Sequence, residues 1–175
     1  DAPIEVGNRM FVDKDDDGSQ DANERGIDGV TVRLIRVSDG QEIATTTTDS
    51  EGKYSFGGVG AADLLAANTD YKITIDNGSG TPLNGYKLAT KDINSNNSDS
   101  IDSDAENDNG TIAINFTTGD AGKNNFTLDA GFVPEVTLVG WIDFDRSGTF
   151  DEDEAVSLDT SNGLNTDGTI NTVEF

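Results

Sequence analysis

The amino-acid sequence predicts an all-β fold, an antiparallel β-sandwich, from three observations. Apolar residues alternate with polar ones in several short segments, which is the pattern of strands with one buried face. Turn-forming residues separate these segments at short intervals. The chain also contains 19 Thr and 16 Asn, residues that favour strands and turns respectively.

The predicted strands follow in chain order. Residues 7–12 are strand-like, and apolar side chains then recur at every second position in 30–34, 71–75, 112–116 and 126–132. Turn signals lie between the strands, at 38–40, 49–52, 77–78, 84–85 and 119–120. We expect about seven to nine strands between Ile4 and Val133. Only residues 61–67 are predicted to be briefly helical.

A domain boundary is predicted at Val133-Pro134, because proline cannot join a central strand ladder and favours an extended predecessor. Residues 1–133 would form the sandwich. Residues 134–175, which begin with a strand at 135–142, are too few to bury much core alone. They are interpreted as a partial second β module, stabilised by a metal, packed on the first domain, or opening a larger domain.

Composition excludes several classes of function. The chain has no Cys and no His, so disulfides, thiolate metal sites, Ser–His–Asp triads and imidazole bases are excluded. The net charge of −23 repels phosphate backbones and anionic lipids, and no apolar run is long enough to span a membrane. Neither nucleic acid nor membrane insertion is expected, and no carboxylate pair is singled out as catalytic, so an enzyme is not expected.

Half of the acidic residues lie in three short segments. Residues 13–24, 99–108 and 143–154 hold 17 of the 34 acidic side chains and only two basic ones. Clustered carboxylates repel one another unless water or a cation neutralises them.

The first segment, DKDDDGSQDANE (13–24), fits a twelve-residue calcium loop. In that loop alternate residues wrap oxygen atoms around the ion, a glycine at position 6 allows the sharp turn, and a glutamate at position 12 closes the site. Gly18 stands at position 6. The predicted ligands are Asp13, Asp15, Asp17, Ser19, Asp21 and Glu24.

The third segment, DFDRSGTFDEDE (143–154), fits the same template with Gly148 at position 6. Its predicted ligands are Asp143, Asp145, Ser147, Thr149, Asp151 and Glu154. Strand-like residues flank both loops, so we interpret them as EF-hand-like loops in β structure, which argues against a helix-opening sensor.

The middle segment has no twelve-residue template. Asp99, Asp102 and Asp104 are candidate ligands of a less regular ion, with a plain solvated loop as the alternative. The sequence therefore predicts two Ca²⁺ sites and leaves a third open.

Four segments together resemble the Sdr-type B domains, which are calcium-binding, Cna B-like repeats of bacterial surface adhesins. These segments are 7–35, 45–59, 99–107 and 125–132, in the family's order. The resemblance implies an immunoglobulin-like β-sandwich whose rigidity depends on calcium. It also implies that Asp13, Asp15, Asp17, Asp21 and Glu24 form the ion loop, that Asp102 and Asp104 belong to a DSD motif, and that Asp129 is a recurrent aspartate.

Residues 140–156 resemble the opening of a second extracellular module, often called GEVED-like. The resemblances imply a spacer module of a large secreted or cell-surface adhesin, next to other domains of the same chain. The alternative is a ligand-binding module that holds a peptide or carbohydrate from a host or the environment.

Overall fold

The computed structural model describes residues 2–61, 64–91, 101–135, 138–141 and 155–158. The chain forms two compact units, Asp1–Pro134 and Glu135–Phe175. Within the described residues all regular structure is β, which agrees with the predicted class. None of the described segments forms a helix with the length and apolar character needed to cross a membrane.

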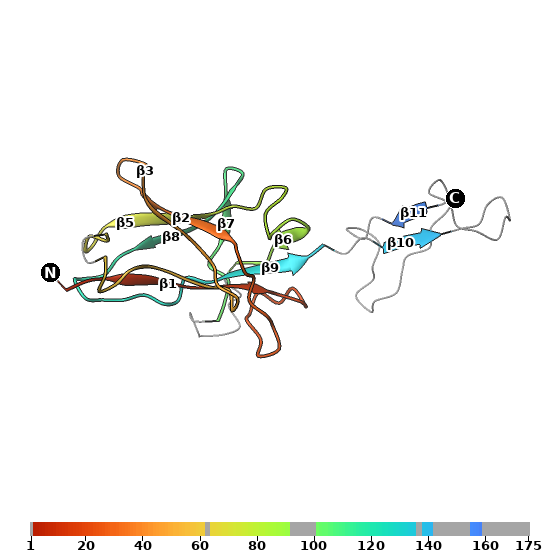
Figure 1. The fold of residues 1–175 in the computed structure, drawn as a ribbon, viewed down its shortest axis with the longest axis horizontal. Coiled ribbons are helices and arrows are strands. Elements are labelled where there is room, and N and C mark those ends of the chain that lie inside the picture. Colours follow the sequence, from red (N-terminus) through yellow and green to blue (C-terminus); the bar gives the residue numbers. More distant parts are fainter. Residues whose placement is uncertain (1, 62–63, 92–100, 136–137, 142–154, 159–175) are drawn as a thin grey trace. The chain divides into compact units, whose positions relative to one another are not determined.

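One sheet of unit 1 has four strands in the order β4-β1-β9-β6 (Figure 1). Its members are β1 (Glu5–Val12), β4 (Lys53–Gly57), β6 (Tyr86–Leu88) and β9 (Ala130–Pro134). β1 pairs antiparallel with β4 but parallel with β9, where Met10 faces Ala130 and Val12 faces Phe132. The expected sheet was antiparallel throughout. The parallel pair arises because the chain crosses between the sheets before β9 returns beside β1.

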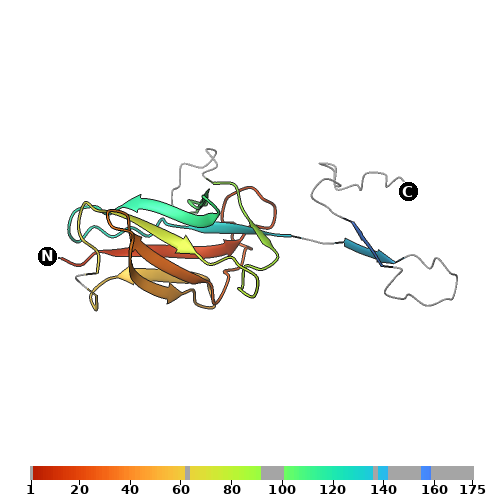
Figure 2. The ribbon, with the colours of Figure 1, turned by 90° about the horizontal axis from the view of Figure 1, so that it is seen from above.

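The other sheet has five antiparallel strands in the order β3-β2-β5-β8-β7 (Figure 2). Its members are β2 (Thr31–Arg36), β3 (Gln41–Thr47), β5 (Asp70–Ile75), β7 (Glu106–Asp108) and β8 (Thr111–Thr117). Nine strands thus lie between Glu5 and Pro134 in the described part of the chain, within the predicted range. Residues 61 and 64–67, predicted to be helical, are not helical: 64–65 form a bend and 67 lies in a turn.

The hydrophobic core lies between the two sheets, as the period-two alternation predicts. Val32 and Leu34 of β2, and Ile73 and Ile75 of β5, are all almost completely buried. Met10 of β1 is buried as well, and all five belong to one cluster that includes residues of the four-stranded sheet. The alternation therefore assigned the inward faces of these strands correctly.

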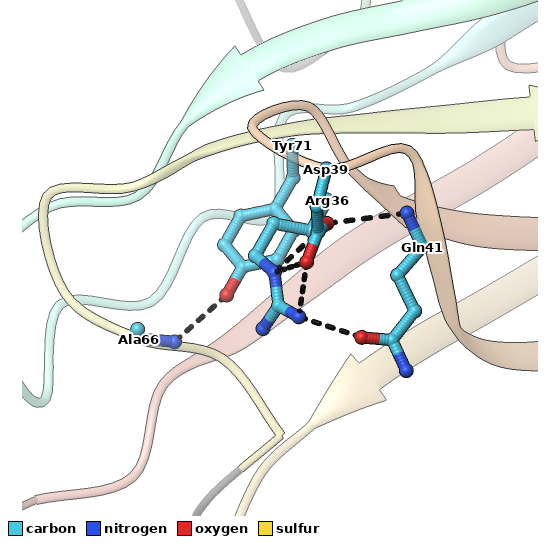
Figure 3. Close-up of polar contacts among 5 residues, drawn as sticks. All are labelled: Arg36, Asp39, Gln41, Ala66 and Tyr71. Atoms are coloured by element: carbon cyan, nitrogen blue, oxygen red, sulfur yellow. Dashed lines mark hydrogen bonds and ion pairs between the residues drawn. The ribbon is translucent and has the colours of Figure 1, made fainter.

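Side-chain hydrogen bonds hold the turns in place. At the β2–β3 turn, the Arg36 guanidinium donates to both Asp39 oxygens and to Gln41 Oε1 (Figure 3). Nearby, the Tyr71 hydroxyl accepts a hydrogen bond from the backbone N–H of Ala66. These contacts fix loops at the end of the sandwich where β1 begins, which is the end opposite the predicted ion loop (Figure 1).

Unit 2 contains a two-stranded antiparallel ladder. β10 (Leu138–Trp141) pairs with β11 (Ala155–Leu158), and Leu138 faces Leu158. The predicted loop at 143–154 lies between these two strands but outside the described residues.

Candidate metal centre

The first predicted ion loop lies between β1 and the segment that leads to β2, at the end of unit 1 where β9 leaves it (Figure 1). Backbone hydrogen bonds join the two ends of this loop. Val12 N–H donates to Arg25 O at 2.9 Å, and Ile27 N–H donates to Met10 O at 3.0 Å. The twelve residues between Val12 and Arg25 are those that the calcium template selects, so the template coincides with a closed structural unit.

Three of the predicted ligands come together in this loop. Asp13, Asp15 and Asp17 each have a carboxylate oxygen within 4.8 Å of the others. The backbone turns sharply in this segment, with positive φ angles of 58° at Asp16 and 75° at Gly18. Glycine adopts such angles without steric cost, which explains the need for Gly18. The spacing of these aspartates along the loop therefore brings three carboxylate oxygens close together.

Asp13 has the most unusual environment of the three. Its side chain is fully buried. Oδ2 accepts a hydrogen bond from Gly18 N–H at 2.8 Å, whereas Oδ1 has no hydrogen-bond partner among the described residues. Burial raises the pKa of Asp13, although backbone N–H groups of the loop partly offset this effect. A buried carboxylate oxygen without a donor is costly, and a divalent cation would satisfy it.

Glu24 makes side-chain hydrogen bonds within the loop, and Asp21 contributes its backbone N–H to one of them. Glu24 is buried, and its two carboxylate oxygens accept hydrogen bonds from Lys14 N–H at 2.7 Å and from Asp21 N–H at 3.0 Å. Neither residue belongs to the cluster of Asp13, Asp15 and Asp17. Glu24 thus closes the loop by hydrogen bonding, at the position where the template has it bind the ion.

The DSD motif, 78 or more residues further along the chain, lies directly beside this loop. Ser19 and Asp102 form an isolated antiparallel bridge. Gln20 N–H donates to Ile101 O at 2.5 Å, and Ser103 N–H donates to Gly18 O at 3.2 Å. Asp102 is buried. Two acidic segments that are separate in the sequence are therefore neighbours in the fold, which the spacing of residues alone could not show.

Asp104 and Asp129 link the DSD motif to β1. Asp104 Oδ2 accepts a hydrogen bond from Asp129 N–H at 2.9 Å, and Asp104 N–H donates to Asp129 O at 2.8 Å. Asp129 is fully buried; its Oδ1 accepts from Arg9 N–H at 3.0 Å and its Oδ2 from Asn8 Nδ2 at 3.1 Å. Burial raises the pKa of Asp129 to about 8. The Asp129 side chain thus accepts the hydrogen bond of Arg9 N–H in place of a backbone carbonyl, just before the parallel pairing of β1 with β9 begins at Met10 and Ala130.

Replacing Asp129 with alanine should lower the free energy of unfolding by about 2–3 kcal/mol, because Arg9 N–H loses its buried acceptor. Replacing it with asparagine should cost less than half as much, since an amide oxygen can still accept from Arg9. Urea unfolding of both variants measures the difference. Equal losses in the two variants would contradict the role of this side chain as the acceptor for Arg9 N–H.

Seven other predicted ligands lie outside the described residues. These are Asp99 of the middle segment and the six ligands of the second loop, namely Asp143, Asp145, Ser147, Thr149, Asp151 and Glu154. The sites assigned to them remain predictions.

Contacts of the loop with β6 were not anticipated from the sequence. Asp16, which is not a ligand in the template, forms an ion pair with Lys87 Nζ at 2.7 Å. Arg25 Nη2 donates to the Tyr86 hydroxyl at 3.0 Å. No spacing rule links residues this far apart, so only the fold could reveal these contacts.

Comparison with known proteins identifies the family of this chain. The model of the SdrD B-like domain matches residues 4–132. Serine-aspartate repeat-containing protein C of Staphylococcus aureus (strain MRSA252) is 36% identical over 153 residues, which are 85% of this chain and 14% of that protein. Serine-aspartate repeat-containing protein D of strain Newman is 33% identical over 153 residues, which are 85% of this chain and 10% of that protein.

Solved structures are more distant. The Bacillus anthracis TIE protein aligns with a TM-score of 0.44 at 12% identity, over 77% of this chain and 18% of that one. The shaft pilin SpaA of Lactobacillus rhamnosus GG aligns with a TM-score of 0.39 at 13% identity, over 79% of this chain and 53% of that one. On the match of the family model to most of unit 1, the chain belongs to the SdrD B-like domain family.

Proposed function

We propose that this chain is a calcium-stabilised structural module, a spacer in a large secreted or cell-surface bacterial adhesin. The relatives support the modular role, because the chain spans only 14% and 10% of their lengths. In this proposal its neighbours are other domains of the same protein. The module itself is not an enzyme.

The observation that carries the proposal is the buried Asp13 carboxylate beside Asp15 and Asp17. Three carboxylate oxygens lie within 4.8 Å of one another, one of the residues is fully buried, and its Oδ1 lacks a donor within the described residues. An acidic patch that merely keeps a protein soluble would be exposed to water on all sides. Hard divalent cations prefer carboxylate and carbonyl oxygens, and Ca²⁺ accepts the irregular geometry that a flexible loop supplies.

The cation would be held by Asp13, Asp15 and Asp17, with Ser19, Asp21 and Glu24 as the remaining members of the template. Asp102 is the neighbouring carboxylate from outside the loop, because it pairs with Ser19. A cation supplies positive charge that cancels the repulsion among these groups. Extracellular calcium modules typically bind at about 0.1–1 mM, so the module would be stable outside a cell and looser inside one.

Isothermal titration of the 175-residue chain with CaCl₂ tests the proposal. We expect at least two ions per chain, one at each twelve-residue loop. Asp13→Ala should remove one of them, and Asp143→Ala together with Asp145→Ala should remove another. Titration with MgCl₂ should give weaker binding, since Mg²⁺ demands a stricter octahedral site. Binding that is undetectable at 10 mM Ca²⁺, about ten times the upper limit of the typical range, would reject a calcium-dependent function.

A further inference from the structure

β6 is the most weakly anchored strand of the four-stranded sheet. It has three residues, Tyr86–Leu88, lies at the sheet edge, and pairs only with β9 among the described strands. Lys87 is exposed, whereas Tyr86 and Leu88 pack partly against the core. Such a short edge strand has low local stability, so contacts worth about 1 kcal/mol change how often it opens.

Among the described residues, the two polar side-chain contacts of β6 both lead to the ion loop. Lys87 Nζ is 2.7 Å from Asp16 Oδ2, and the Tyr86 hydroxyl accepts from Arg25 Nη2 at 3.0 Å. Asp16 lies between the clustered Asp15 and Asp17, and Arg25 follows Glu24, the last residue of the template. The conformation of the loop therefore determines whether these two groups can reach β6.

β6 in turn covers the strand that leads out of unit 1. Its residues pair with the last residues of β9, Tyr86 with Pro134 and Lys87 with Val133. Unit 1 ends at Pro134. On the other side of β9, Asp13 N–H donates to Phe132 O at 3.0 Å. The end of β9 thus lies between the first residue of the ion loop and a strand that the same loop contacts.

We propose that a cation in the 13–24 loop holds β6 against β9, so that occupancy of the loop controls the order of the exit strand. The inference rests on the proposed calcium function. Without the cation, repulsion among Asp13, Asp15 and Asp17 spreads the loop and withdraws Asp16 and Arg25 from β6. With the cation, the loop closes and both contacts form. The coupling is reciprocal, so fixing β6 also favours cation binding.

Hydrogen–deuterium exchange of the full chain, with saturating CaCl₂ or with EGTA, tests this coupling. We expect calcium to slow exchange in peptides covering 13–24 and also in peptides covering 86–89, the latter by roughly 5-fold or more. In the double variant Tyr86→Phe and Lys87→Met, the loop should keep its calcium protection while residues 86–89 lose most of theirs.

Lys72→Met is the matched control. Lys72 forms an ion pair with Asp108 at 3.0 Å on the five-stranded sheet. Removing this ion pair should leave the calcium response of β6 unchanged. Protection of the loop without any protection of 86–89 would overturn the inference and leave the calcium site intact. Equal protection of 86–89 in wild type and double variant would overturn it too. Absence of calcium protection in both segments would instead reject the proposed function itself.

Discussion

Replacing Asp13 and Asp17 with alanine should abolish the stabilisation of unit 1 by calcium. A cation at about 100 times its dissociation constant, bound only by the folded state, adds roughly 2.7 kcal/mol. For a unit of this size that corresponds to a shift of the melting temperature by about 10 °C. The double variant should therefore melt about 10 °C below the parent protein in calcium and close to it in EGTA.

The melting temperatures of the parent protein and the double variant should be nearly equal in EGTA for a physical reason. Alanine at position 13 removes the acceptor of Gly18 N–H, which costs about 1 kcal/mol. It also removes a buried carboxylate whose Oδ1 lacks a hydrogen-bond partner among the described residues, and it relieves repulsion with Asp15. The loss of the acceptor opposes the other two effects, so most of the loss should depend on calcium.

Thermal melts followed by circular dichroism, with CaCl₂ and with EGTA, measure this difference. Parent and variant should both carry Asp143→Ala and Asp145→Ala, so that the second predicted loop does not contribute. Asp28→Ala with Asp120→Ala is the matched control, because it removes the same charge from two exposed positions outside the loop. A parent melting temperature that EGTA leaves unchanged would contradict a calcium-stabilised fold.

Local spacing is what made part of this site predictable. Asp13, Asp15 and Asp17 are close in the sequence. The sharp turn at residue 18 is predictable because glycine is the residue that adopts a positive φ angle without steric cost. Alternation likewise assigned Val32 and Ile73 to the core. In both cases the signal lies in residues a few positions apart, which fix a local turn or the face of a strand, so the sequence pattern agrees with the structure.

The features that the sequence did not predict depend on contacts between segments that are distant in the chain. The parallel pairing of β1 with β9 joins residues about 120 positions apart, as Met10 and Ala130 show. Asp129 has an ordinary sequence context, yet it becomes a buried acceptor because the ladder beside Arg9 is interrupted. Glu24 fits a ligand position, yet backbone N–H groups within the loop bind both its oxygens. Periodicity carries no information on which distant segments become neighbours.

Gly26 lies at another such contact between segments, just after the ion loop. Phe11 and Gly26 form an antiparallel bridge. On its other side Gly26 faces the turn before β4, where Met10 N–H donates to Gly52 O at 2.8 Å. A Cβ atom at Gly26 would lie 1.9 Å from Glu51 O and 2.4 Å from Gly52 N. These are backbone atoms held by the β1–β4 ladder, so they cannot move aside at low cost.

Gly26→Ala should therefore destabilise unit 1 by about 3 kcal/mol or more, through overpacking against the backbone. Urea unfolding in EGTA measures this loss without any contribution from calcium. Gly78→Ala is the control, since a Cβ there would meet nothing within 4 Å, and it should change stability by less than about 1 kcal/mol. Gly40→Ala isolates the backbone effect, because it adds a side chain in open space at a φ of 67°.

The same substitution should also weaken calcium binding. Arg25 O and Ile27 N–H, on either side of Gly26, pair with Val12 and Met10 and close the ion loop. Pushing residue 26 away from Glu51 displaces this closing pair of hydrogen bonds. The carboxylates of Asp13 and Glu24, at the two ends of the loop, are then shifted from their native positions. We expect a dissociation constant for calcium raised several-fold in Gly26→Ala and unchanged in Gly78→Ala. Unaltered affinity in a destabilised Gly26→Ala protein would mean that the loop binds calcium independently of the sandwich beneath it.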